Sequence, residues 1–238
     1  MRPGIIISDY LTGVFNAFAI MMALYHRDVH RGGGQWVDLA LYESIFRIME
    51  HTVASYDRLG IVREREGNRL RNSAPLDNWE TKDGQFVCIV AAGDGLFPRL
   101  ARAMGREELL HDPRFATFTA RVQHADAING IVGDWVRQHT AAEVETILVA
   151  AQVPVTRAHS IADIAADPHY AARDDIVAVD DPVVGPVRMQ AVYPRLSETP
   201  GRIQRGAPRL GEHNQEVYGS LLGLAAPEIA ALRAAGVI

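Results

Sequence analysis

Apolar side chains recur at helical spacing near the start of the chain. The longest apolar run extends from Val14 to Tyr25 and is interrupted only by Asn16. Its spacing predicts a buried helix whose free backbone N–H groups are capped by Ser8 or Asp9. Basic residues follow the run, where the negative end of a helix dipole favours positive charge.

Three glycines, at positions 32–34, come directly after this helix. Glycine tolerates the left-handed conformation in which helices commonly end, so we interpret them as a helix exit. The alternative, a phosphate-binding loop, requires a strand before the glycines and a helix after them. Here the glycines lead into a short predicted strand, 35–39, and then a second helix, 41–52.

Periodicity is lost between Tyr56 and Trp79, which predicts a long loop. This segment contains five arginines and two glutamates. A solvated surface is a simpler interpretation of these charges than a phosphate-binding site. Long connections without regular structure are often functional. Its Gly67-Asn68 pair can adopt positive φ and bring backbone close to a ligand.

The remaining pattern alternates hairpins and helices. Turn residues and capping signals predict the following elements: a hairpin of 78–81 and 85–92, helices over 96–104, 119–138 and from 141, an extended segment within 153–158, a second hairpin of 176–179 and 187–192, and two short closing helices. Asp112 and Asp167 each precede a proline, which is typical of a helix start rather than of a catalytic carboxylate.

Composition narrows the class of protein. The 238 residues are 48% hydrophobic and 22% charged with a formal net charge of -5, so the chain offers no basic field for nucleic acid or an anionic membrane surface. The apolar run is shorter than the roughly 20 residues needed to cross a bilayer. We expect a cytoplasmic protein. The single cysteine, Cys88, excludes a disulfide within the chain and is expected to be buried and inert.

Catalytic motifs are not evident from residue spacing. The sequence contains no Walker loop, dinucleotide fingerprint or Gly-x-Ser-x-Gly elbow. Its nine histidines are scattered beside predicted caps and turns, so no metal site is predicted. The residues alone therefore identify no reaction.

Several segments, in order, resemble the C-terminal part of the class III CoA-transferases. This family includes formyl-CoA transferase, carnitine CoA-transferase and the related alpha-methylacyl-CoA racemases. The resemblance depends on these segments: "SDYLTGVFNAFAIMMALYHRD", "GGGQWVDLALYES", "GNRLRNSAP", "WETKDGQFVCIVA", "DPRFAT", "VPVTRAHSIADIAADPHYAARD", "RLGEHNQEV" and "EIAALRAAGVI". Each is weak alone, but their shared order and spacing make the resemblance specific.

The resemblance implies an α/β fold in which both chain ends form part of a Rossmann-like large domain. The middle of the chain would form a smaller α+β domain. The expected division is 1–60 in the large domain, 61–189 in the small domain and 190–238 returning to the large one. In such relatives two chains interlock.

The resemblance also implies a mechanism. An aspartate attacks an acyl-CoA thioester, an aspartyl-CoA intermediate forms, and a carboxylate acceptor then receives CoA. That aspartate is expected upstream of Met1, with Asp9 serving only as a helix cap, so no catalytic residue is assigned. A substrate-binding loop is implied at Gly67, Asn68, Asn72 and Ala74, where the glycine-rich lid of the transferases is replaced by arginine and asparagine.

Three interpretations stay open at this stage. The chain is part of a CoA-transferase that needs an N-terminal half chain, a non-catalytic dimerising remnant, or a fragment of a racemase-like enzyme. No tightly bound cofactor is expected, and a CoA thioester would be a substrate. Apolar helix faces around Phe15, Phe18 and Met22 would be exposed without a partner, which predicts a homodimer or a complex with an N-terminal half chain.

Overall fold

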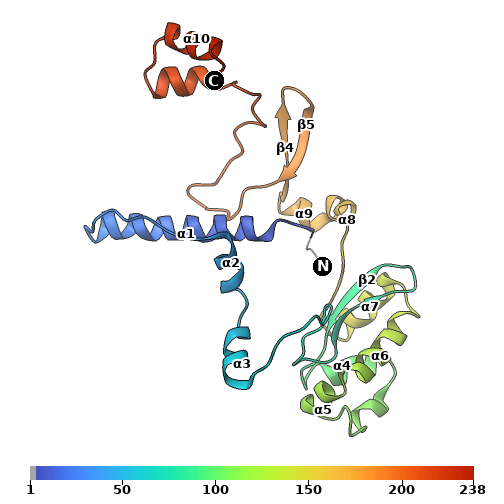
Figure 1. The fold of residues 1–238 in the computed structure, drawn as a ribbon. Coiled ribbons are helices and arrows are strands. Elements are labelled where there is room, and N and C mark those ends of the chain that lie inside the picture. The colour runs from blue at the N-terminus through green and yellow to red at the C-terminus, as the bar shows by residue number, and fades with distance from the viewer. Residues whose placement is uncertain (1–3) are drawn as a thin grey trace. The chain divides into compact units, whose positions relative to one another are not determined.

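The computed structural model describes residues 4–238 and contains two compact units, Met1–Arg69 and Leu70–Ile238 (Figure 1). Helices dominate the first unit, and antiparallel sheets with helices make up the second. This mixture agrees with the predicted α/β class. The finer division into 1–60, 61–189 and 190–238 stays a prediction.

Three helices form the first unit: α1 (Ile7–Val29), α2 (Leu41–Arg47) and α3 (Thr52–Leu59). The helix α1 begins after Ile6, with no side chain capping it, so the predicted cap by Ser8 or Asp9 is wrong. Asp9 lies instead inside the first turn, where a carboxylate still interacts favourably with the helix dipole.

The helix α1 is not buried in this chain, contrary to the prediction. Thr12 is its one buried residue, and Phe18 is 66% exposed, because no other element of the first unit covers its apolar side chains. It is also longer than the apolar run, at 23 residues, because polar residues extend it at both ends. Within residues 4–238 it is the one helix long and apolar enough to cross a membrane, a criterion that core helices of soluble proteins also meet.

The exit from α1 uses its glycines differently from the prediction. Arg31 takes the left-handed conformation, with φ of 54°, and the N–H of Gly32 donates to the carbonyl of His26. A Cβ on Gly32 would lie 2.1 Å from Nε2 of His26, so this glycine permits a close approach. As predicted, the glycines follow a helix rather than precede one.

Segment 35–39 is not a strand, and the predicted helix 41–52 is divided in two. The described part of the first unit contains no strand with which 35–39 could pair, and an isolated strand is not stable in water. The break between α2 and α3 falls at Glu50, which has φ of 53°.

The second unit begins with a three-stranded antiparallel sheet of β1 (Leu76–Glu80), β2 (Phe86–Val90) and β3 (Val155–Arg157), in that order. The predicted first hairpin is confirmed, and its turn has Gly84 at φ of 72°. The predicted extended segment 153–158 contains β3. Cys88 lies on β2 and is half-buried rather than buried as predicted.

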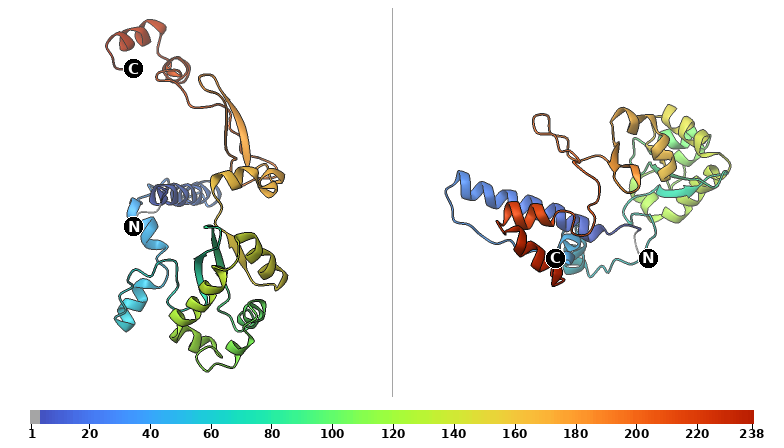
Figure 2. Two further views of the ribbon diagram at one scale, coloured as in Figure 1. Left: turned by 90° about the vertical axis from the view of Figure 1, so that its right-hand side faces the viewer. Right: turned by 90° about the horizontal axis from the view of Figure 1, so that it is seen from above.

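Five helices of this region form the apolar core together with the sheet. They are α4 (Phe97–Ala103), η1 (Glu107–Leu110), α5 (Phe118–Gln123), α6 (Ala125–Val136) and α7 (Ala141–Ala150). Figure 2 shows these helices on the same side of the molecule as the sheet. The helix α6 contacts β1, and α7 contacts β2 and β3. Leu100, Ile128, Val132 and Leu148 are fully buried between them.

The helix predictions in this region are mostly confirmed. The helix α4 ends before Gly105, at φ of 69°, and the Thr140–Glu143 capping box opens α7. The predicted helix 119–138 is two helices, because the backbone of His124 leaves the helical region at φ −114° and ψ 35°.

The last third of the chain contains a second antiparallel hairpin and short helices. Its elements are α8 (Ile161–Ala166), α9 (Pro168–Ala172), β4 (Ile176–Asp181), β5 (Gly185–Gln190), the π-helix η2 (Gln215–Leu221) and α10 (Ala226–Ala234). The second hairpin and the two closing helices are confirmed. Asp167 caps α9 by accepting from the N–H of His169 at 2.6 Å, as predicted. Asp112 accepts from the N–H of Arg114 but opens a turn rather than a helix.

Candidate functional site

The predicted substrate loop lies between α3 and β1. Gly60 ends α3 in the left-handed conformation, and irregular backbone follows up to Gly67. Gly67 has φ of 68°, so the positive φ predicted for the Gly67-Asn68 pair is found at the glycine. An isolated β-bridge then joins Leu70 to Ser73. The boundary between the two compact units falls inside this loop, after Arg69.

The four predicted substrate-binding residues therefore divide between the units. Gly67 and Asn68 belong to the first unit and are exposed, whereas Asn72 and Ala74 belong to the second. Asn72 is exposed, and Ala74 is fully buried in the apolar core. The substrate-binding role of these four residues stays a prediction.

The C-terminal end of the loop is held rigidly by the second unit. The carbonyl of Pro75 accepts from the N–H of Ala91 at 3.1 Å, which joins the loop to β2. The side chain of Asn129, on α6 and 2% exposed, accepts from the N–H of Leu76 at 3.3 Å. The backbone carbonyl of Asn129 accepts from Nε1 of Trp79 at 3.0 Å. Asn72 is thus three residues from Pro75, where these hydrogen bonds begin to hold the chain.

A buried arginine fixes a second loop, which connects β2 to α4. The side chain of Arg121 is 1% exposed and donates to the backbone carbonyls of Ala92 and Phe115, at 2.7 and 2.9 Å. It also pairs with Asp94 at 2.6 Å and lies over the ring of Phe97, 4.5 Å from its centroid. These bonds all come from Nη1 and Nη2, while the buried Nε of Arg121 has no hydrogen-bond partner among the described residues. They tie the backbone and side chain of residues 92–94 to a buried cation.

Sequence reasoning missed Arg121, although a signal for it exists. Arg121 precedes Ala125, Ile128 and Val132 by four, seven and eleven residues, which is the spacing of one helix face. A cation on an otherwise apolar face is a candidate for a buried, hydrogen-bonded group.

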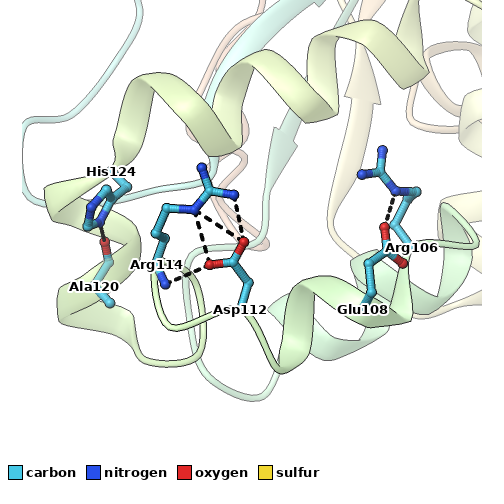
Figure 3. A network of polar contacts seen from close by, with 6 residues as sticks. All are labelled: Arg106, Glu108, Asp112, Arg114, Ala120 and His124. Carbon is cyan, nitrogen blue, oxygen red and sulfur yellow. Dashed lines mark hydrogen bonds and ion pairs between the residues drawn. The ribbon is translucent and has the colours of Figure 1, made fainter.

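The ionic contacts near α5 are local and stabilise turns rather than a reaction centre (Figure 3). Asp112 accepts two hydrogen bonds from the guanidinium of Arg114 through Oδ2, at 2.7 and 3.2 Å, and these bonds hold its pKa below the ordinary value. A hydrogen bond from Arg106 likewise lowers the pKa of Glu108. Both carboxylates are thereby kept ionised as partners of neighbouring arginines.

Other carboxylates of lowered pKa cap helices and turns. The N–H and hydroxyl of Thr140 bind Glu143, and the hydroxyl and N–H of Ser160 bind Asp163. The N–H groups of Val183 and Val184 lower the pKa of Asp181 in the turn between β4 and β5. Each of these three carboxylates thus binds the N–H or hydroxyl groups of a helix start or a turn, and its negative charge has a structural role.

Metal binding is not supported within residues 4–238, where no group of three or more histidine, cysteine, aspartate or glutamate side chains converges. His26 and His30 are four residues apart near the end of α1, a spacing that can serve a metal pair. Their ring centroids are 6.3 Å apart, but no third ligand joins them within the described chain.

The chain is similar in sequence to part of several longer proteins. Residues 1–214 match the sequence pattern of CoA-transferase family III. The chain is 40% identical over 237 residues to succinyl-CoA–D-citramalate CoA-transferase of Chloroflexus aurantiacus, covering 100% of this chain and 59% of that protein. It is 41% identical over 234 residues to the beta subunit of succinyl-CoA–L-malate CoA-transferase of the same species, covering 98% and 58%.

A solved structure shows the same fold. A CAIB/BAIF family protein from Brucella suis has a TM-score of 0.75 and 28% identity, over 93% of this chain and 57% of that chain. The chain thus spans somewhat more than half the length of the relatives it matches. Because the family pattern matches most of its residues, the chain belongs to CoA-transferase family III.

Proposed function

We propose that this chain forms part of an enzyme that transfers CoA from succinyl-CoA to a 2-hydroxydicarboxylate. The observation that carries this proposal is the identity of 40% and 41% with transferases named for D-citramalate and L-malate. Both named acceptors are dicarboxylates with a hydroxyl group beside one carboxylate. Identity of this degree extends over nearly the whole chain, which supports a shared acceptor class.

The proposed reaction runs through an aspartyl-CoA intermediate. An aspartate carboxylate attacks the thioester carbonyl of succinyl-CoA and releases CoA thiolate, leaving a mixed anhydride. The thiolate then attacks the aspartyl carbonyl, which releases succinate and forms aspartyl-CoA. The acceptor carboxylate and the thiolate repeat these two steps in reverse order, which frees the aspartate. Covalent relay of this kind divides one difficult exchange into easier steps.

We infer that the nucleophilic aspartate belongs to a part of the family fold outside these 238 residues. Asp9 lies within the first turn of α1, and Asp167 caps α9, so both have structural roles. In this proposal the chain contributes the loop from Gly67 to Ala74 as a wall of the acyl site. Gly67 presents backbone at positive φ, and the buried Ala74 attaches the end of the loop to the second unit.

We further propose that the chain works in a complex, either as a homodimer or with an N-terminal half chain. One relative named above is a beta subunit of a transferase, which supports assembly from more than one polypeptide. An N-terminal half chain would supply the nucleophilic aspartate, whereas a homodimer of this chain would not.

Acyl exchange measured by mass spectrometry of the thioesters tests the function. The purified chain alone is expected to convert no D-citramalate or L-malate to its CoA ester in the presence of succinyl-CoA. A complex with a polypeptide that carries the rest of the fold is expected to do so. An inert but fully assembled complex would contradict the proposed activity, and an acyl or CoA adduct on the lone chain would contradict the placement of the aspartate.

The loop is tested separately by Asn68→Ala in the active complex. Loss of a polar contact to the acyl group is expected to lower kcat/KM by about tenfold, since one lost hydrogen bond is worth ~1 to 1.5 kcal/mol. Asn78→Ala is the matched control, because Asn78 is equally an exposed asparagine but lies on β1. Equal kinetics for the two variants would remove Asn68 from the site.

A further inference from the structure

The helix α1 exposes apolar side chains along most of its length. We use the term α1 apolar surface for six residues that are each more than half exposed: Val14, Phe18, Met21, Met22, Tyr25 and Val29. No charged residue lies between Tyr10 and Tyr25 to break this surface. Contiguous apolar surface of this extent is uncommon on a soluble monomer and marks an interaction site.

The most deeply buried contact between α1 and α2 is polar. The hydroxyls of Thr12 and Ser44 lie 2.8 Å apart and are buried. Ser44 also donates to the carbonyl of Leu41 at 2.9 Å. The two buried residues of the described first unit are therefore polar, whereas most of the large apolar side chains of α1 are exposed, the reverse of a finished soluble fold.

A groove is also present beside α1, formed mainly by α2 and the residues after it. It encloses about 680 Å³ and is lined mainly by apolar side chains, among them Phe15, Phe46, Met49 and Val53. The side chains of Phe46 and Val53 are each more than half exposed. A groove of this size and composition can accept several apolar side chains from another structural element.

The family match indicates what covers the surface. The matched region, 1–214, contains all of α1, so the helix is part of the family fold and not an anchor added to it. The chain covers 59% of the D-citramalate transferase and 57% of the Brucella suis chain, so about two fifths of each relative lies outside it. We propose that the α1 apolar surface and the groove beside α1 bind a polypeptide that carries this remaining part of the CoA-transferase fold. The inference rests on the proposed function and assigns the surface through which the complex forms.

Co-purification tests this assignment. The tagged chain is co-expressed with the part of the D-citramalate transferase that it does not match. A 1:1 complex is expected, and Phe18→Lys with Met22→Lys is expected to weaken it more than about tenfold, since buried apolar anchors carry most of the binding energy of an interface. The same partner co-expressed with the matching part of its own transferase is the positive control.

The matched control carries Val183→Lys and Val184→Lys. These residues are 66% and 71% exposed, close to the exposure of Phe18 and Met22, but they lie in the turn between β4 and β5. The control is expected to bind as the wild type does. Equal loss in both double variants would overturn the proposal, as would no binding to a partner that assembles with the positive control.

Two further outcomes would assign the surface to another occupant and overturn the proposal. One is a homodimer of the chain alone that the α1 lysines dissociate while the partner fails to bind. The other is binding of the chain to liposomes that the same lysines abolish. The assay also separates the two proposals. A stable but inactive complex supports the docking surface and contradicts the proposed function. An active complex that tolerates the α1 lysines supports the function and contradicts the docking surface.

Discussion

The first unit and the sheet-and-helix core of the second unit use similar apolar residues to opposite effect. In the described part of the first unit only Thr12 and Ser44 are buried, and both are polar. In the second unit, seventeen buried apolar residues form one core around β1, β2 and the helices α4, α6 and α7. Amphipathic periodicity is present in both. The difference shows that periodicity becomes burial only where another element packs against the apolar face.

The largest expected effect comes from the same substitution in the two regions. Leu100 on α4 is fully buried, whereas Leu59 at the end of α3 is 71% exposed. Leu100→Ala is expected to lower the free energy of unfolding by about 3 kcal/mol, through lost burial and the cavity left behind. Leu59→Ala should change it by less than ~0.5 kcal/mol. Urea unfolding followed by circular dichroism measures both, and similar losses would refute the contrast between the regions.

A pair of glycines within α6 sharpens the description of the core. A Cβ on Gly133 would lie 2.8 Å from Cδ1 of Trp79, whereas a Cβ on Gly130 would meet nothing within 4 Å. Gly133→Ala is expected to destabilise the protein by ~1 to 3 kcal/mol through overpacking. Gly130→Ala should stabilise it by ~0.5 to 1 kcal/mol, because alanine is the better helix former. Thermal unfolding reports both, and two changes of the same sign would contradict the packing of α6 on β1.

The smallest expected effect concerns the hairpin turn next to α7. The hydroxyl of Thr81 donates to Asp83 at 2.6 Å and, with the N–H of Ala141 at 3.1 Å, lowers the pKa of Asp83. The unfolded chain has an aspartate pKa of about 3.9. Because the pKa of Asp83 is lower in the folded state, its ionised carboxylate stabilises the fold above that pH, and this stability is lost as the pH falls through the folded-state pKa.

Asp83→Asn should therefore lower the thermal midpoint slightly at pH 7 and progressively less as the pH is brought below about 4. Asp180→Asn on β4 is the control for a general loss of negative charge. A difference between wild type and Asp83→Asn that grows on acidification would contradict the sign of the pKa change.

The candidate site was predictable only in part. The Gly67-Asn68 pair, with irregular backbone before it, was evident from glycine chemistry and lost periodicity, and Gly67 has the predicted positive φ. The attachment at Pro75 and Leu76 was not evident, because it depends on hydrogen bonds with Ala91 and Asn129 from distant parts of the chain. Sequence spacing cannot specify such pairs.

By itself, the sequence determined the local elements of the second unit. The Asp-Gly turn set the first hairpin, the Thr140–Glu143 box opened α7, and Asp167 before a proline began α9, because each signal acts within a few residues. Only the tertiary structure decided burial. The apolar helix α1 is exposed, segment 35–39 has no strand to pair with, and Arg121 is buried, because each outcome depends on what another element brings against those residues.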